Sequence, residues 1–251
     1  MKRIAAPLLT LVGKSIERRR FSDPPIYIGG CGRSGTTLLL SILSAHPDIF
    51  ACPRELWLFQ GASIKNKKVR VPKFYRLYRT FIRSRIPATA KRYCEKTPSN
   101  ILDFELIDHL HHGNFRFIQI IRDGRDVILS KHPRDDSKYW ISPERWIRDI
   151  NMGLKYLDHP KVHTIKYESL VTEFDKTIEG ICDFLGIPLL GEIKNWHKYA
   201  SVRENRALFS PIQEISNSSV GKWKLEENKE RMKELTDLPE GIKLLKELNY
   251  L

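Results

Sequence analysis

A glycine-rich turn near the start of the chain has the residues needed to hold a phosphate-like anion. The turn GGCGRSGTT, residues 29–37, follows the apolar run 26–28 and leads into an apolar, helix-like segment. Backbone N–H groups of such a turn, together with the start of the next helix, form a nest for anions. Arg33 adds a cation there. Thr36 stands where a nucleotide-binding P-loop has its lysine, which argues against ATP hydrolysis.

A second candidate anion site lies in FIQIIRDGRDVILS, residues 117–130. Arg122 follows an apolar strand, and we expect Ser130 within the helix that comes next. Because ligands of open α/β sheets bind at the carboxyl ends of the strands, Arg122 and Ser130 could converge on a second anion. Asp123 also resembles the metal-linked acid of an ATP-dependent P-loop kinase, which is the alternative enzyme class.

The elements that position these turns alternate between strands and helices. Apolar runs predict strands at 25–29, 115–121 and 161–167. Helical spacing predicts helices at 35–45, around 146–157 and around 178–185, and a further helix that starts at Thr97-Pro98. The alternation predicts an α/β fold with a mainly parallel sheet. We expect one domain, residues 25–251, preceded by a basic N-terminal leader, residues 1–24.

The net charge of +13 is concentrated in one segment. No acidic residue occurs from 56 to 94, and lysines and arginines gather at 65–92 around a helical apolar stripe. This basic helical segment is either a solvated helix face or a contact surface for an anionic acceptor, membrane or polymer. A non-catalytic protein that binds anionic polymers is therefore a third functional class. We expect no nucleic-acid partner, and the sequence does not predict an oligomeric state.

The leader and the cysteines indicate the type of compartment. Cations interrupt the apolar residues of the leader, so no run reaches the roughly 20 residues of a membrane-spanning helix, and a signal peptide fits poorly. These features predict a cytoplasmic protein with peripheral membrane contact as an option. The four cysteines are far apart and predict neither a zinc site nor a disulfide framework.

Six motifs together resemble the sulfotransferases that use 3'-phosphoadenosine 5'-phosphosulfate (PAPS). In chain order they are GCGRSGTTLLLSILSAHPDI, EKTP, FIQIIRDGRDVILS, KYESLV, CDFLGIP and SSVGKWK, from about residue 26 to 224. The pattern is closer to the tyrosylprotein and carbohydrate sulfotransferases than to the small-phenol enzymes. The resemblance implies a P-loop-type three-layer fold, with a central, mainly parallel sheet flanked by helices. It also implies PAPS as donor, 3',5'-ADP as product and no metal.

The resemblance also assigns residues to the donor. It places the 5'-phosphosulfate on the first turn, the 3'-phosphate on Arg122 and Ser130, and the adenine near Tyr167. A late loop would close over the nucleotide through Ser219, Lys222 and Trp223. The residues implied for the 5'-phosphosulfate are Gly32, Arg33, Ser34, Gly35, Thr36 and Thr37.

Catalytic roles follow from the needs of sulfuryl transfer, which are a base for the acceptor proton and a cation for the developing charge. Lys96 in CEKTP is the expected cation, and Arg33 shares that role. The resemblance implies Glu55 as the base, because it follows the first helix by about ten residues, where tyrosylprotein and many carbohydrate sulfotransferases place a catalytic glutamate. A histidine is the alternative, but His109, His111 and His112 cluster at a helix end, where we expect surface residues.

The basic helical segment lies between Glu55 and Lys96 in the chain, so it is expected to form one wall of the acceptor site. This position favours an acceptor that is already anionic. We expect a sugar hydroxyl on a polymer or glycolipid ahead of a protein tyrosine or a small phenol.

Overall fold

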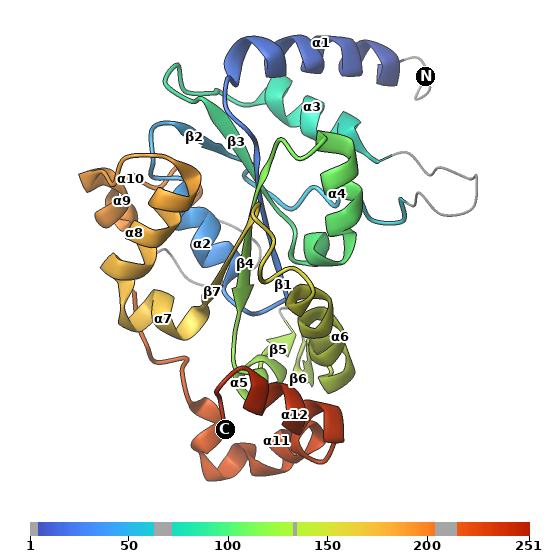
Figure 1. Cartoon of the computed structure of the whole chain (residues 1–251), viewed down its shortest axis with the longest axis vertical. Helices are drawn as coiled ribbons and strands as arrows, with labels where there is room; N and C mark the ends of the chain where they lie inside the picture. The colour runs from blue at the N-terminus through green and yellow to red at the C-terminus, as the bar shows by residue number, and fades with distance from the viewer. Residues whose placement is uncertain (1–4, 63–71, 133–134, 204–214) are drawn as a thin grey trace.

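The computed structural model describes residues 5–62, 72–132, 135–203 and 215–251, and its centre is a five-stranded parallel sheet (Figure 1). The strand order is β2-β3-β1-β4-β7, and all four neighbouring pairs are parallel. The strands are β1 (Ile26–Gly30), β2 (Ile49–Ala51), β3 (Arg92–Lys96), β4 (Arg116–Ile121) and β7 (Val162–Lys166). The three predicted strands are therefore confirmed to within one or two residues, whereas no strand range was predicted for β2 or β3.

Helices cover both faces of this sheet, because alternate strand residues point to opposite sides. Ile26, Ile28 and Ile118 pack on one face against α2 (Thr36–Leu43), α7 (Tyr167–Thr172), α8 (Phe174–Leu185), α9 (Gly191–Lys194) and α10 (Trp196–Tyr199). Tyr27 and Phe117 pack on the other face with α1 (Ala5–Arg20), α3 (Phe74–Arg83) and α4 (Phe104–His111). The predicted three-layer α/β architecture is confirmed.

A third apolar cluster lies beyond the carboxyl ends of the strands. Trp146 and Ile121 belong to it, and the two last helices complete it (Figure 1). Its elements are α5 (Gly124–Ile128), α6 (Pro143–Leu154), α11 (Lys229–Thr236) and α12 (Pro239–Glu247). An antiparallel hairpin of β5 (Lys131–His132) and β6 (Asp135–Tyr139) lies next to α5, and η2 (Lys222–Lys224) and η3 (Glu226–Asn228) precede α11.

The helix predicted at Thr97-Pro98 begins differently from expectation. Residues Pro98–Asp103 form the 3-10 helix η1, and α4 starts only at Phe104. The Thr97 side chain makes no capping bond, because its hydroxyl is hydrogen-bonded to Glu95 and to the Trp57 N–H. The Thr97 side chain therefore connects β3 to the loop at Trp57 and does not cap the helix.

Candidate functional site

Three neighbouring strand ends bring the predicted site residues together. β1 pairs with β3 on one side and with β4 on the other, with Ile28 opposite Lys96 and Gly30 opposite Ile120. The glycine-rich turn, Lys96 and Arg122 therefore leave the sheet at one edge. Because the strands are parallel, this edge is the carboxyl edge at which α/β sheets bind ligands.

The glycine-rich turn has the closed backbone of an anion nest. Gly30 has φ 144° and Gly35 has φ 92°, and a Cβ atom at Gly35 would lie 2.4 Å from Cδ2 of Tyr167. Arg33 also takes a left-handed conformation, with φ 68°. α2 then starts at Thr36 without a side-chain cap, so the N–H groups of its first turn face the nest.

The nest has the features of a site for a phosphate or sulfate group. The Ser34 side chain is fully buried, and its hydroxyl has no hydrogen-bond partner within the part of the chain that the structure describes. Burial, and then the charge of Arg122, lower the pKa of Arg33. A bound phosphate or sulfate group would give the hydroxyl a partner and neutralise the two guanidinium groups.

Lys96 connects this nest to the predicted base. Its side chain is fully buried, and Nζ lies 2.9 Å from Oγ1 of Thr37 and 2.6 Å from Oε1 of Glu55. The Glu55 side chain keeps 23% of its surface exposed. One ammonium group thus touches both the first turn of α2 and a carboxylate that opens to solvent, so the structure brings Glu55, Lys96 and Thr37 into direct contact.

A buried carboxylate that we did not anticipate from the sequence fixes the loop carrying Glu55. Glu95 is fully buried, and its Oε1 accepts hydrogen bonds from the Leu56 N–H at 3.1 Å and from Thr97 Oγ1 at 2.7 Å. Thr97 Oγ1 in turn accepts from the Trp57 N–H at 3.2 Å. Trp57 has φ 50°, a conformation that a bulky residue keeps only when its surroundings hold it there. These bonds therefore hold a strained turn directly after Glu55.

A basic groove of about 510 Å³ opens beside Glu55. Arg76 of α3 lines it, and its NH1 donates to the Leu56 carbonyl at 2.9 Å, which holds the Glu55 loop from the groove side. Glu55 is the single acidic residue of the lining that the structure describes, which also includes Arg54, Tyr75, Arg79 and Arg83. Four arginines thus line the groove beside the expected base. The predicted basic residues Lys65, Lys67, Lys68 and Arg70 lie outside the described residues.

Arg122 holds together the second predicted anion site. Its NH1 donates to the Arg33 carbonyl at 2.9 Å and its NH2 to the Ser219 carbonyl at 2.5 Å. Its guanidinium lies 4.4 Å from the centre of the Tyr167 ring, and the Tyr167 hydroxyl is 2.6 Å from Ser219 Oγ. Arg33, Arg122, Tyr167 and Ser219 therefore meet, although Ser219 is far from the others in sequence.

The position predicted for Ser130 is wrong. α5 ends at Ile128, and Ser130 follows it at the entrance to the β5–β6 hairpin, where its carbonyl accepts from the Trp140 N–H at 2.9 Å. Pairing within the hairpin therefore ends the helix two residues before Ser130. Ser130 therefore does not lie on the helix that follows Arg122.

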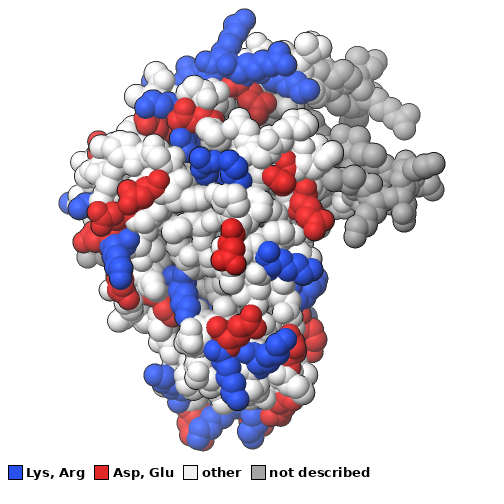
Figure 2. All heavy atoms as spheres, viewed as in Figure 1, with Lys and Arg blue, Asp and Glu red and all other residues white. Residues whose placement is uncertain are grey.

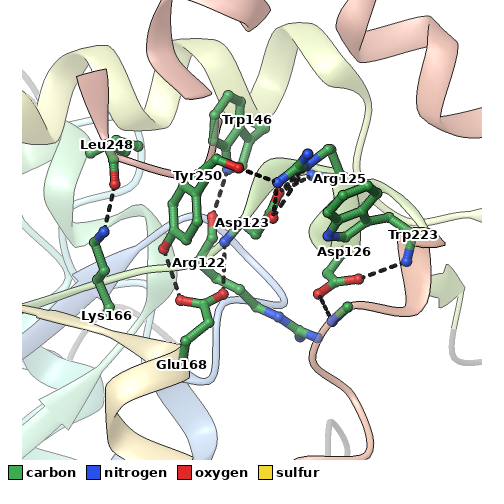
Figure 3. Close-up of polar contacts among 11 residues, drawn as sticks. Arg122, Asp123, Arg125, Asp126, Trp146, Lys166, Glu168, Trp223, Leu248 and Tyr250 are labelled. Carbon is green, nitrogen blue, oxygen red and sulfur yellow. Dashed lines mark hydrogen bonds and ion pairs between the residues drawn. The ribbon is translucent and has the colours of Figure 1, made fainter. Parts of the chain in front are cut away.

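The late segment around Trp223 is held against α5, the helix that follows β4 (Figure 3). Asp126 accepts from the Gly221 N–H at 2.7 Å and from the Trp223 N–H at 3.1 Å. The Trp223 ring lies 3.6 Å from the Arg125 guanidinium, which is also paired with Asp123 at 2.7 Å. Trp223 and Ser219 are thus held near Arg122, whereas Lys222 between them is exposed.

The three histidines lie away from these strand ends. His109 and His112 are exposed as predicted, but His111 is half-buried, with Nε2 2.8 Å from the Tyr27 hydroxyl. Burial lowers the pKa of His111 to about 4. The surface position predicted for His111 is wrong, because α4 turns its last residue toward the aromatic core that includes Tyr27 and Phe74. In the described ranges, no group of three or more His, Cys, Asp or Glu residues could hold a metal ion.

Comparison with known proteins identifies the family that shares this arrangement. Residues 23–237 match the model of the sulfotransferase domain family. A Caenorhabditis briggsae protein provisionally named protein-tyrosine sulfotransferase is 28% identical over 79% of this chain and 80% of its own length. A Drosophila melanogaster protein-tyrosine sulfotransferase is 25% identical over 78% of this chain. The chain spans 44%, 56% and 54% of the lengths of the fly, chicken and zebrafish relatives.

Solved structures show the same fold. The sulfotransferase domain of a Synechococcus olefin synthase superposes with a TM-score of 0.56 at 20% identity, covering 87% of this chain and 96% of that domain. A mouse sulfotransferase complexed with PAP gives a TM-score of 0.55 at 17% identity, covering 96% and 95% of the two chains.

Proposed function

Because this chain belongs to the sulfotransferase domain family, it is a PAPS-dependent transferase, and we propose that its acceptor is a tyrosine hydroxyl in an acidic stretch of protein. The observation that carries the catalytic assignment is the contact of Lys96 with both Thr37 and Glu55. Family membership favours the sulfotransferase over the kinase and polymer-binding alternatives. A cytoplasmic location remains a prediction.

The roles of the chain's own residues follow from this contact. PAPS supplies the sulfuryl group when bound. Glu55 takes the proton of the acceptor hydroxyl as the oxygen attacks, because its carboxylate is the acidic group that opens to the groove. Lys96 places its ammonium group at the start of α2, where negative charge develops on the leaving phosphate, and Arg33 adds a second cation at the turn.

The nucleotide would be held at two separate anion sites. The first turn, from Gly32 to Thr37, would hold the 5' end, and Arg122 would hold the 3'-phosphate beside Tyr167. Ser219 and Trp223 would cover the nucleotide, since the structure holds the late segment against Arg122 and Arg125. Ser130 lies after the end of α5, and Lys222 is exposed. Nucleotide binding by these two residues remains a prediction.

The 3'-phosphate assignment can be tested by binding alone. We expect Arg122→Ala to weaken 3',5'-ADP binding by about 10–100-fold, because a charge-assisted contact with phosphate is lost. The affinity for 5'-AMP, which has no 3'-phosphate, should change little. Calorimetric titration of both nucleotides measures the difference. Arg116→Ala, at the other end of β4, is the matched control, and an equal loss for both nucleotides would contradict the assignment.

The basic groove is the basis for the acceptor proposal. Arg54, Arg76, Arg79 and Arg83 favour an anionic acceptor, and a groove that leads to Glu55 would place the acceptor hydroxyl at the base. The names of the relatives favour protein tyrosine over the sugar hydroxyl that we ranked first from the sequence. An anionic glycan is the second candidate, because the same arginines would bind its charges.

Charge reversal in the groove separates acceptor binding from donor binding. We expect Arg79→Glu to raise the KM for a tyrosine peptide with acidic flanks by about tenfold or more, with kcat nearly unchanged. The same variant should have little effect on a peptide with glutamine flanks. Steady-state kinetics at two salt concentrations test this, with Arg85→Glu, outside the groove lining, as control. An equal KM for both peptides in the unmodified enzyme would rule out recognition of acidic flanks.

A further inference from the structure

The outer face of α1 exposes aliphatic side chains that the domain does not cover. Leu8, Leu11 and Val12 are 67%, 71% and 43% exposed. Their i, i+3, i+4 spacing places them on one side of the helix. The opposite side packs against α3, where Gly13 is so close to Tyr78 that a Cβ atom would lie 2.1 Å from Tyr78 Cβ. Two strongly exposed leucines on one helix face indicate a surface made for contact.

The exposed charges of α1 are all positive. Lys14, Arg18 and Arg19 are exposed, and Arg18 and Arg19 continue the side that carries Leu8 and Leu11. Glu17 is the one acidic residue of the helix, and it lies on the inner side near Tyr78 and Tyr93, where burial raises the pKa of its carboxyl group. The surface view shows the resulting basic strip along the edge where α1 lies (Figure 2). The outer face is therefore apolar over its first turns and cationic over its last.

The helix is fixed to the domain, so it presents this face in one orientation. Phe21, just after α1, packs against Phe81 and Tyr93 with ring centres 5.1 and 5.4 Å apart. Arg20 donates to the Ile86 carbonyl at 3.0 Å. No helix in the described part of the chain is long and apolar enough to cross a membrane. Because α1 is packed along α3, its outer face would contact a membrane with the helix lying along the surface.

We propose that the outer face of α1 binds the surface of an anionic phospholipid bilayer. Leu8, Leu11 and Val12 would enter the boundary between headgroups and acyl chains, and Lys14, Arg18 and Arg19 would contact the phosphates. A soluble polyanion would use the cations but leave the leucines in water. A second copy of the chain, paired through the same face, would bring like charges together. An anionic lipid surface would bury the apolar part of this face and also bind its cationic part.

Co-sedimentation of the whole chain with vesicles tests this proposal. We expect binding to vesicles of phosphatidylcholine with phosphatidylglycerol, weaker binding to phosphatidylcholine alone, and a decrease as salt rises. Leu8→Ser/Leu11→Ser should lower the partition coefficient more than about tenfold although the charge is unchanged. Arg18→Gln/Arg19→Gln should lower it by a similar factor, since each cation near the surface adds about fivefold.

The control removes equal charge from the opposite end of the molecule. Lys229→Gln/Lys233→Gln changes two exposed lysines of α11, and vesicle binding should not change. Absence of binding to the anionic vesicles would overturn the proposal. Full binding by the leucine variant would also overturn it, because the cations alone would then explain the interaction. Transfer to a soluble peptide should be the same in all these variants, so the result is independent of the proposed acceptor.

Discussion

Glu55→Gln is expected to lower kcat for transfer to tyrosine by about 10²–10⁴-fold, the range typical of a lost general base. The amide keeps the shape of the side chain and an oxygen for Lys96 Nζ, now 2.6 Å from Glu55 Oε1, but it cannot take up the acceptor proton. The Kd for 3',5'-ADP should stay the same. Rapid-quench or steady-state sulfation of a tyrosine peptide measures the loss.

The acceptor itself provides a sharper test of the base. A fluorinated tyrosine that is already ionised at the assay pH needs no base, so the Glu55→Gln deficit should shrink to within about tenfold. Glu105→Gln, on an exposed part of α4, is the matched control. A deficit that is equally large for both acceptors would mean that Glu55 positions the acceptor or Lys96 and is not the base.

Lys96→Ala is expected to lower kcat by about 10²–10³-fold, as removal of a preorganised donor at a developing charge does elsewhere. This loss should persist with the fluorinated acceptor, because the cation acts on the leaving group rather than on the acceptor proton. Glu55 keeps partial exposure to water, so the variant should fold. Thermal unfolding checks folding, and single-turnover transfer measures the chemical step.

Lys91→Ala is the control for Lys96. Lys91 lies just before β3, at the strand end opposite to Lys96, and also forms an ion pair, with Asp48 at 2.9 Å. Transfer should be unaffected by this change. Because Lys96 and Glu55 are in direct contact, the double variant should lose less than the product of the two single losses. If the loss in the double variant equals the product of the two single losses, Lys96 and Glu55 act independently.

The central part of the fold could be predicted because its signals are local. The apolar runs that become β1 and β4 are followed by turns that contain Arg33 and Arg122. Parallel pairing of neighbouring strands then brings these turns to one edge of the sheet. The position of Lys96 follows in the same way, since β3 pairs with β1 and ends at this lysine.

The support of the Glu55 loop could not be predicted, because it depends on contacts between distant segments. Glu95 accepts a hydrogen bond from the N–H of Leu56, which is 39 residues away in the chain. Arg76 of α3 donates to the carbonyl of the same Leu56, which is 20 residues away. No periodicity marks these pairs. Glu95 is completely buried within β3, and such a charged group needs hydrogen-bonding partners, but its burial becomes evident only in the structure.

Errors at element ends have a similar origin. Ser130 was expected in a helix because the residues after Arg122 favour one, but pairing in the β5–β6 hairpin ends α5 at Ile128. Thr97 has the sequence features of a helix cap, yet its hydroxyl is hydrogen-bonded to Glu95 instead. In both cases a tertiary contact prevails over the local preference.

The most direct test of tyrosine sulfation by this chain is transfer of labelled sulfate from PAPS to a tyrosine peptide with acidic flanks. The same peptide with phenylalanine in place of tyrosine, and an anionic glycan, serve as parallel acceptors. We predict label on the tyrosine peptide alone, lost with Lys96→Ala and kept with Lys91→Ala. Label on the glycan but not on the tyrosine peptide, or transfer that survives Lys96→Ala undiminished, would contradict the account.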